Sequence, residues 1–509
     1  METRTLNSKR NIIAGGLCNC LLPVFGLIVN ASVVRCLSVE YLGLAGTFNA
    51  VLQVLNLAEL GFSTAMTVNL YRPLKDDDVP AVRGMLGYFR RVYRIIGLVI
   101  LVLGVMVCPF LGKLVKDSGK IGDNIIILYI LFLVNKAITF LLYAHKEALL
   151  NALQRFDIIK LVHIIAFAVK SCLQILAVVV FRNFYFFAAA LILGTVLYNV
   201  AMDILSKKKF PQYYPEGSID DELKLTVKRQ VAGLSVANVL GVSRDSLNSI
   251  LITSFFGLYI AGKYSNYCTI YDAVIGFFLV TTKAVMASIG NSIVSESVEK
   301  NYENLTKMEF LQNIVTTAST AYLLSLYQPF MKVWMGEELL FPDPVMITFV
   351  LYFYIRAMSE VRNAYFSALG YWWKAKWIFV TEAVVVIILM VILGRLLGVA
   401  GIILAPCVSV LTVNYIGITN LMFREYFKTG PGEYYRNRVV YTVITVLVSA
   451  AAWKVCDLVP YEGIAGIAVR LLSCTLVLAI MIPALMYLLK REYMKESVSF
   501  VRQIITAKR

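Results

Sequence analysis

The stretch LGLAGTF, residues 42–48, is matched 216 positions later by LYIAGKY, residues 258–264. A second pair, ALQRFDIIK at 152–160 and ALGYWWKAK at 368–376, is separated by the same distance. Each pair shares few identical residues. However, one ungapped offset recurs at two places about 110 residues apart, and this indicates an internal repeat.

The composition predicts a polytopic α-helical membrane protein. Of the 509 residues, 59% are hydrophobic and 16% are charged, and the mean hydropathy is +0.73. Soluble proteins contain about 25% charged residues. Apolar runs of about 18 residues or more recur along the whole chain, and each is long enough to cross a bilayer.

We expect fourteen spans, near residues 11–37, 44–70, 92–111, 124–144, 160–181, 184–205, 229–256, 264–290, 310–333, 344–368, 375–397, 399–423, 438–456 and 463–489. An even number puts both termini on one side. Loops on that side hold about 32 Lys and Arg residues, against about 8 on the other side. Because cytoplasmic loops carry the excess of basic residues, both termini are expected in the cytoplasm of a bacterial or archaeal cell.

The repeat and the spans together predict two lobes in the same orientation, related by an axis along the membrane normal. The N-lobe covers 1–205 with helices 1–6, and the C-lobe covers 228–424 with helices 7–12. Between them lies a cytoplasmic linker, 206–227. Residues 425–509 supply two further helices and a cytoplasmic tail. Such a pair of bundles encloses a cleft near the bilayer midplane, where substrates of transporters bind.

Polar residues line one face of several expected helices. Helix 2 carries Asn49, Gln53, Asn56 and Glu59, and the 216 offset maps the first three onto Ser265, Thr269 and Asp272 of helix 8. Helix 1 carries Asn30 on the same face as Pro23, which is expected to kink the helix. These faces either form hydrogen bonds between helices or line a polar cavity.

Charged residues also lie deep inside expected spans, although burying a charge in lipid is costly. The stretch VLGVSRDSLNSIL, 239–251, contains Arg244, Asp245 and Asn248. We interpret the deep cations as ligands of an anionic substrate in a shared cavity: Lys136, Lys170, Arg244, Lys283, Arg356 and Arg362. Arg35 at the end of helix 1 either binds substrate or extends to the membrane interface. Asp245, Asp272 and Glu360 are candidates for charge pairing or ion coupling.

Other classes of site are not indicated. The net charge of +16 is spread over alternate loops, which fits membrane topology and not nucleic acid binding. The chain has two histidines, His145 and His163, and nine scattered cysteines, so we expect no metal centre. We interpret His163 as structural. A glycine-rich phosphate loop ending in GK is missing, so we expect no ATP hydrolysis, no cofactor and no enzymatic activity.

With these residues in view, the sequence resembles the polysaccharide repeat-unit flippases of the Wzx type, within the multidrug/oligosaccharidyl-lipid/polysaccharide exporter (MOP) superfamily. The stretches that carry the resemblance are EYLGLAGTFNAVLQVLNLAELGFSTA from Glu40, RDSLNSILITSFFGL from Arg244, YSNY from Tyr264, ASIGN from Ala287, PFMKVWMG from Pro329, RNAYFSALG from Arg362 and GVAGI from Gly398. They span nearly the whole chain.

The resemblance implies flipping of a polyprenyl-diphosphate-linked oligosaccharide from the cytoplasmic to the outer leaflet, for synthesis of capsule, exopolysaccharide or O-antigen. It implies two six-helix lobes that work by alternating access. The partners would be the lipid-linked oligosaccharide, membrane lipid, and a polymerase with other polysaccharide-assembly proteins. The chain departs from the family where members often read DN, because here Ser246 follows Asp245 and the asparagine is Asn248.

Two other functions compete with this interpretation. A cation-coupled multidrug exporter of the same superfamily would be expected to have an acidic residue within helix 1, but residues 11–37 contain none. A membrane glycosyltransferase or polymerase would need long outer loops with catalytic acids, and no loop exceeds about 25 residues.

Overall fold

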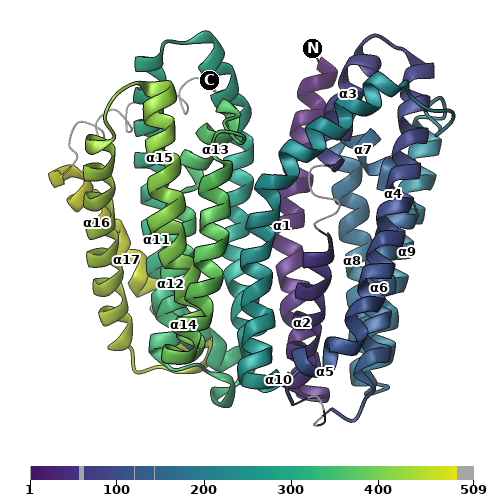
Figure 1. Cartoon of the computed structure of the whole chain (residues 1–509). Coiled ribbons are helices and arrows are strands. Elements are labelled where there is room, and N and C mark those ends of the chain that lie inside the picture. The colour runs from purple at the N-terminus through teal and green to yellow at the C-terminus, as the bar shows by residue number, and fades with distance from the viewer. Residues whose placement is uncertain (1, 57–61, 118, 120, 143, 490–509) are drawn as a thin grey trace. The chain divides into compact units, whose positions relative to one another are not determined.

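The computed structural model describes residues 2–56, 62–117, 119, 121–142 and 144–489, and all the elements it assigns to them are helices (Figure 1). Side chains are described for most of these residues, but not for the start of α1 or for parts of α10. The predicted all-α, polytopic membrane fold is confirmed. Contacts divide the chain into two compact units, Met1–Ile270 and Tyr271–Arg509. The division lies inside α10, so the predicted lobe boundaries at 205 and 228 stay a prediction.

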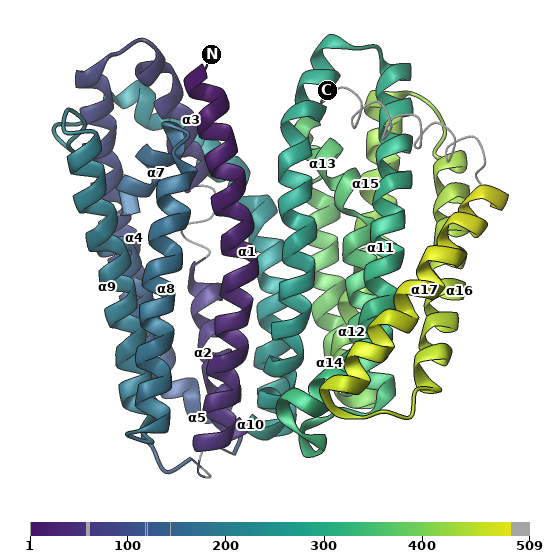
Figure 2. The ribbon, with the colours of Figure 1, turned by 180° about the vertical axis from the view of Figure 1, so that it is seen from behind.

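The first unit contains α1 to α9 and the first part of α10. Their bounds are α1 Glu2–Cys36, α2 Val39–Leu55, α3 Phe62–Lys75, α4 Val79–Val107, α5 Leu111–Leu114, α6 Ile125–Leu141, α7 Ala144–Ala152, α8 Phe156–Val179 and α9 Phe184–Lys209. Helix α10, Asp221–Ser295, is two helices joined at Gly257, whose φ of 83° interrupts the helical conformation. Figure 2 shows α1 beside α8, a pair that packs along most of its length.

The second unit contains the rest of α10 and the helices that follow it. These are α11 Val298–Met335, α12 Asp343–Met358, α13 Glu360–Leu369, α14 Lys376–Ser409, α15 Ile416–Met422, α16 Gly432–Asp457 and α17 Gly463–Leu489. Two π-helical segments, Val410–Tyr415 and Phe423–Phe427, flank α15. Helices α16 and α17 pack against α11 around a core that includes Phe310, Tyr441 and Cys474.

Each of the fourteen expected spans overlaps a helix, and several overlap more than one element, among them 44–70, which overlaps both α2 and α3. The expected span 344–368 divides at Ser359, between α12 and α13. The Ser359 hydroxyl donates to the carbonyl of Ile355 at 2.9 Å, and such bonds to the preceding turn bend helices. Seven helices in the described part are long and apolar enough to cross a membrane, or eight if the bent pair α6 and α7 forms one span.

Helix ends are fixed by short polar side chains and by residues in the left-handed conformation. Asn124 and Asn183 accept hydrogen bonds from the first backbone N–H groups of α6 and α9. Gln154 (φ 57°) follows α7 and Gly370 (φ 67°) ends α13, whereas Gly398 (φ 64°) interrupts the helical conformation inside α14, and Arg182 (φ 46°) lies in the turn before α9. Gln154 and Gly370 are separated by 216 residues, and so are Arg182 and Gly398, which is the offset of the predicted repeat.

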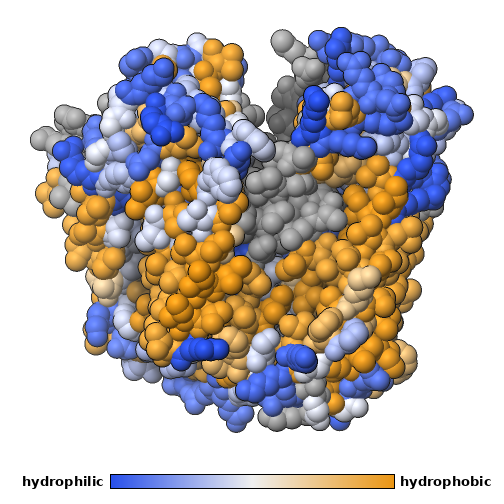
Figure 3. Space-filling view, viewed as in Figure 1, coloured by the Kyte–Doolittle hydropathy of each residue, from blue (hydrophilic) through white to orange (hydrophobic). Residues whose placement is uncertain are grey.

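Apolar side chains cover the middle of each unit. On the face shown in Figure 3, hydrophobic residues form the central part of each bundle and hydrophilic residues gather at its two ends. Exposed apolar side chains of the two units include Ile95, Leu193, Ile388 and Leu476. Because water would not favour so much exposed apolar area, these surfaces are expected to face lipid.

Candidate functional site

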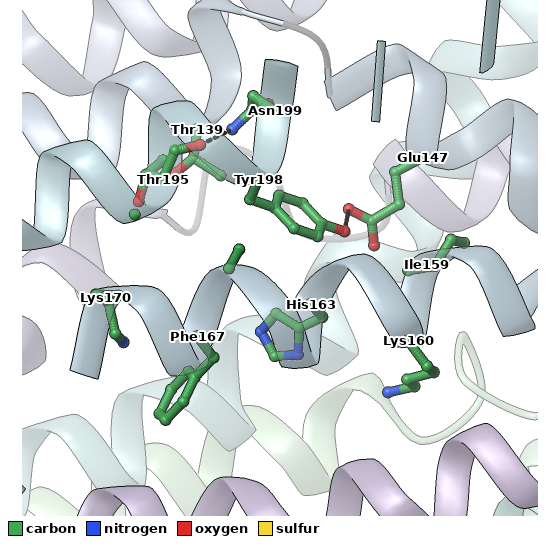
Figure 4. Close-up of a pocket in the computed structure, with 12 residues that line it drawn as sticks. Thr139, Glu147, Ile159, Lys160, His163, Phe167, Lys170, Thr195, Tyr198 and Asn199 are labelled. Carbon is green, nitrogen blue, oxygen red and sulfur yellow. Dashed lines mark hydrogen bonds between the residues drawn. The ribbon is translucent and has the colours of Figure 1, made fainter. Parts of the chain in front are cut away.

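A cavity of about 350 Å³ lies inside the first unit, between α6, α7, α8 and α9 (Figure 4). Its lining residues are Thr139 from α6, Glu147 from α7, Ile159, Lys160, His163, Ala166, Phe167 and Lys170 from α8, and Gly194, Thr195, Tyr198 and Asn199 from α9. We call it the N-unit pocket. Cavities of this size hold small ligands, but not a lipid-linked oligosaccharide.

One face of α8 supplies the positive charge of the N-unit pocket. Lys160, His163, Phe167 and Lys170 are spaced by three, four and three residues, so they lie on one side of the helix (Figure 4). The ammonium of Lys170 lies 3.8 Å from the centroid of the Phe167 ring, within the range of a cation–π contact. Gly194 leaves room for the Lys170 stem, since a Cβ built there would be 2.7 Å from the lysine Cβ.

The opposite wall is a hydrogen-bonded network. The Tyr198 hydroxyl donates to Oε2 of Glu147 at 3.1 Å, and the Thr195 hydroxyl donates to Oδ1 of Asn135 at 2.7 Å. Nδ2 of Asn199 donates to the carbonyl of Thr195 at 2.9 Å. These bonds hold the hydroxyl groups of Thr195 and Tyr198 and the amide group of Asn199 in place, because each of the three groups donates to an acceptor on the protein.

Helix α1 contacts the lysine-bearing face of α8. The rings of Phe25 and Phe167 have centroids 6.3 Å apart, and Sγ of Cys18 lies 3.8 Å from Nδ1 of His163. The His163 ring also contacts Tyr198, with centroids 5.8 Å apart. Phe167 and His163 therefore line the N-unit pocket and also contact α1, the helix that contains Pro23.

The predicted cations are divided between the two units. In the first unit, Lys170 lines the N-unit pocket, Lys136 lies on α6 with its ammonium 5.8 Å from the Phe140 ring, Arg244 is half-buried on α10, and Arg35 is exposed in the last turn of α1. In the second unit, Arg356 lies on α12, 5.9 Å from the Tyr352 ring. The side chain of Lys283 lies outside the described residues. A cavity shared by these cations stays a prediction.

Arg362 is held by the second unit itself. It is buried, and it donates to the carbonyl of Tyr415 at 3.0 Å and to Oδ1 of Asn414 at 2.9 Å. Asn414 in turn donates to Glu382 at 2.7 Å. These contacts tie α13 to α14 and to the π-helical segment that follows it. They give the guanidinium a structural role, and its predicted part in substrate binding is untested.

A buried ion pair joins α16 to α11 within the second unit. Arg438 of α16 lies 2.8 Å from Glu309 of α11, and both side chains are almost fully buried. Tyr434 also donates to Glu309, and Nε of Arg438 donates to the Tyr415 hydroxyl at 3.0 Å. Sequence reasoning missed this pair, because the two residues are far apart in the chain and both lie near the ends of expected spans.

The predicted polar residues have different environments. Nδ2 of Asn30 on α1 donates to Thr269 of α10 at 3.0 Å, so two of the predicted polar faces do meet. The side chains of Asn49 and Gln53 on α2 and of Asp272 on α10 are exposed, whereas Asn56, Asn248 and Glu360 are buried. Glu59 and the side chain of Asp245 lie outside the described residues.

The two copies of the opening motif contact each other within the first unit. A Cβ built at Gly43 on α2 would lie 2.2 Å from the carbonyl oxygen of Leu258, and one built at Gly262 on α10 would lie 2.1 Å from that of Val39. Only glycine permits this backbone approach. We call it the glycine contact. One turn further along, Gly46 faces the side chain of Ser265.

Sequence reasoning found Lys170 but missed most of the N-unit pocket. His163, which we interpreted as structural, lies in the pocket wall and also contacts Cys18, Phe167 and Tyr198. The sequence does contain a signal for this pocket, which is the helical spacing that puts Lys160, His163 and Lys170 on one face of α8. Among the described residues, no group of three His, Cys, Asp or Glu side chains is placed to hold a metal ion.

Comparisons place this architecture among known transporters. No family model matches the chain, and no curated protein matches its sequence. The lipid II flippase MurJ in an inward closed conformation superposes with a TM-score of 0.68 at 15% identity, over 94% of this chain and 99% of MurJ. An inward-facing multidrug resistance MATE family transporter of the MOP superfamily gives 0.64 at 15% identity, over 82% and 98%.

A MATE transporter from Vibrio cholerae gives a TM-score of 0.59 at 14% identity, over 84% of this chain and 99% of that one. Identities this low show a common fold and do not show what this chain does. Together with the apolar helices, the matches identify the chain as a multi-pass membrane protein with the fold of the MOP-superfamily transporters.

Proposed function

We propose that this protein flips polyprenyl-diphosphate-linked oligosaccharide repeat units from the cytoplasmic to the outer leaflet by alternating access. The observation that carries the proposal is the positive charge inside the first unit. Lys136 and Arg244 lie within its helices and outside the N-unit pocket, which is too small for this substrate. Such an interior attracts a diphosphate and disfavours an organic cation.

Two further points support a lipid-linked substrate. The match to MurJ extends over 94% of the chain, while the MATE matches cover 82% and 84%, so the flippase fold accounts for more of this molecule. The expected cytoplasmic position of both termini would place the basic loops at the leaflet where such lipids are made. A polymerase and other assembly proteins would then receive the flipped product.

A cation-coupled multidrug exporter is the second candidate, and the observation in its favour is the same fold in the MATE transporters. The substrates of the two functions differ in charge, because a flippase would carry an anionic diphosphate and a multidrug exporter would carry an organic cation. Loss of interior positive charge should impair a flippase for a diphosphate, whereas it should leave the export of an organic cation intact or improve it.

The test replaces Arg244 with alanine and, separately, with lysine in a cell whose surface polysaccharide depends on this protein. Lost charge-assisted hydrogen bonds are worth about 1.5–3 kcal/mol, so Arg244→Ala should lower polymer export at least about tenfold. Lipid-linked repeat units should accumulate on the cytoplasmic side, and Arg244→Lys should retain more activity.

The matched control is Lys454→Ala, because Lys454 is an exposed cation on α16. It should export normally at equal membrane abundance. Normal export by Arg244→Ala would refute the charge argument. Normal polysaccharide export combined with unchanged or reduced sensitivity to organic cations would favour the drug exporter instead.

A further inference from the structure

The N-unit pocket has unused hydrogen-bond donors, and they are cationic. The hydroxyls of Thr195 and Tyr198 donate to Asn135 and Glu147, and the Asn199 amide donates to a backbone carbonyl. Lys170 contacts the Phe167 ring, and no acidic partner lies against its ammonium among the described residues. Lys160, ten residues earlier on the same face, adds a second ammonium to the pocket wall.

The charge of the N-unit pocket is therefore unbalanced. Two lysines and one glutamate line this pocket between four helices, so it has one more cationic side chain than acidic side chains. An isolated charge in such a low-dielectric space is unfavourable, so one negative charge beside Lys170 would stabilise it. A divalent anion would leave the pocket with a net negative charge. A lipid diphosphate with its sugar is too large for a volume of about 350 Å³.

We propose that the N-unit pocket binds a small monovalent inorganic anion, of the size of chloride, beside the ammonium of Lys170. The ion accepts hydrogen bonds from Lys170, and Lys160 adds long-range attraction. It lies beside Phe167, whose ring contacts Phe25 two residues beyond Pro23 on α1. Occupancy therefore stabilises the face of α8 on which α1 packs. This site does not depend on which molecule the transporter carries.

The experiment measures equilibrium binding of radioactive chloride to the purified full-length protein, after exchange into a gluconate buffer. The wild type should show one saturable site. Lys170→Met keeps the length of the side chain but removes the charge, and it should weaken binding at least tenfold. Lys170→Arg keeps the charge and should bind more tightly than Lys170→Met.

Lys376→Met is the matched control. Lys376 lies 4.0 Å from the centroid of Trp373, so this variant removes a lysine with the same kind of cation–π contact outside the pocket. It should bind chloride like the wild type. If Lys170→Met does not fold, Lys160→Met decides, because it removes the excess charge and should also weaken binding.

Three results would overturn the proposal: no saturable binding to the wild type, undiminished binding in a folded Lys170→Met or Lys160→Met variant, or an equal loss in Lys376→Met. None of them bears on polysaccharide export. A failure of the anion site can therefore be told apart from a failure of the proposed function.

Discussion

The glycine contact between α2 and α10 can be tested by adding one methyl group. The alanine Cβ of a Gly43→Ala variant would lie 2.2 Å from the carbonyl oxygen of Leu258 and 2.8 Å from the backbone nitrogen of Gly262. Ordinary contacts of this kind begin at 3.4 Å, so the two backbones must separate by about 1 Å. Overpacking of this size costs about 1–3 kcal/mol, which lowers the population of the closed contact about 5- to 150-fold.

The fraction of molecules in which the glycine contact between α2 and α10 is closed can be measured by the rate of disulfide formation. A Cβ built at Gly46 lies 3.7 Å from the Cβ of Ser265, close to the mean of about 3.8 Å found in disulfides. In a chain whose nine cysteines have been replaced, the pair Gly46→Cys and Ser265→Cys should oxidise rapidly in membranes. Adding Gly43→Ala should slow oxidation about 5- to 150-fold, and in the proposed alternating-access cycle the disulfide should stop export until it is reduced.

Two controls isolate the contact. Gly26→Ala adds the same methyl group to α1 at a position with nothing within 4 Å, so it should leave the oxidation rate unchanged. Cysteines at Thr317 and Thr445, whose hydroxyl oxygens lie 2.7 Å apart in the second unit, should oxidise equally fast with or without Gly43→Ala. An unchanged rate at positions 46 and 265 in Gly43→Ala, or an equal slowing in Gly26→Ala, would refute the reasoning.

Two other predictions concern topology and the buried ion pair. Ser218 and Glu337 are both exposed, so single cysteines at these positions should report the orientation of the chain in the membrane. An impermeant thiol reagent added to intact cells should label position 337 and not position 218. The reverse result would show that the predicted orientation is wrong. Arg438→Met leaves the buried Glu309 carboxylate without its guanidinium, so it should destabilise the detergent-solubilised protein by about 3–5 kcal/mol in thermal unfolding. Arg436→Met, at an exposed position beside Glu433, should cost less than about 1 kcal/mol, and equal effects of the two variants would contradict this account.

The helical fold could be predicted from the sequence because lipid imposes strong local rules. A span needs a long apolar run, and its backbone must bond within itself, so run length alone locates most helices. The break at Ser359 was not predicted, because a serine in an apolar helix usually leaves the helix intact. The Ser359 hydroxyl donates to the carbonyl of Ile355, and the sequence does not give the side-chain rotamer on which this bond depends.

The candidate site was predictable only in part, since its residues come together through packing. Lys170 was found because a cation deep in a span is conspicuous by itself. Glu147 and Tyr198 became part of the same site only because the bend between α6 and α7 brings α7 beside α9. The partners of Arg362 lie 52 and 53 residues further along the chain, so its structural role could not be read from the residues next to it.

The left-handed residues at 216-residue spacing bear on how the backbone of each half is specified. A left-handed conformation costs a residue with a side chain about 1–2 kcal/mol, whereas glycine adopts it freely. Gly370 and Gly398 avoid this cost, but Gln154 and Arg182 bear it. The local preference of the residue therefore cannot be what sets these turns in the first half. Their shape is imposed by the helices they join, and a search for glycine-marked turns would find the junctions of the second half and miss those of the first.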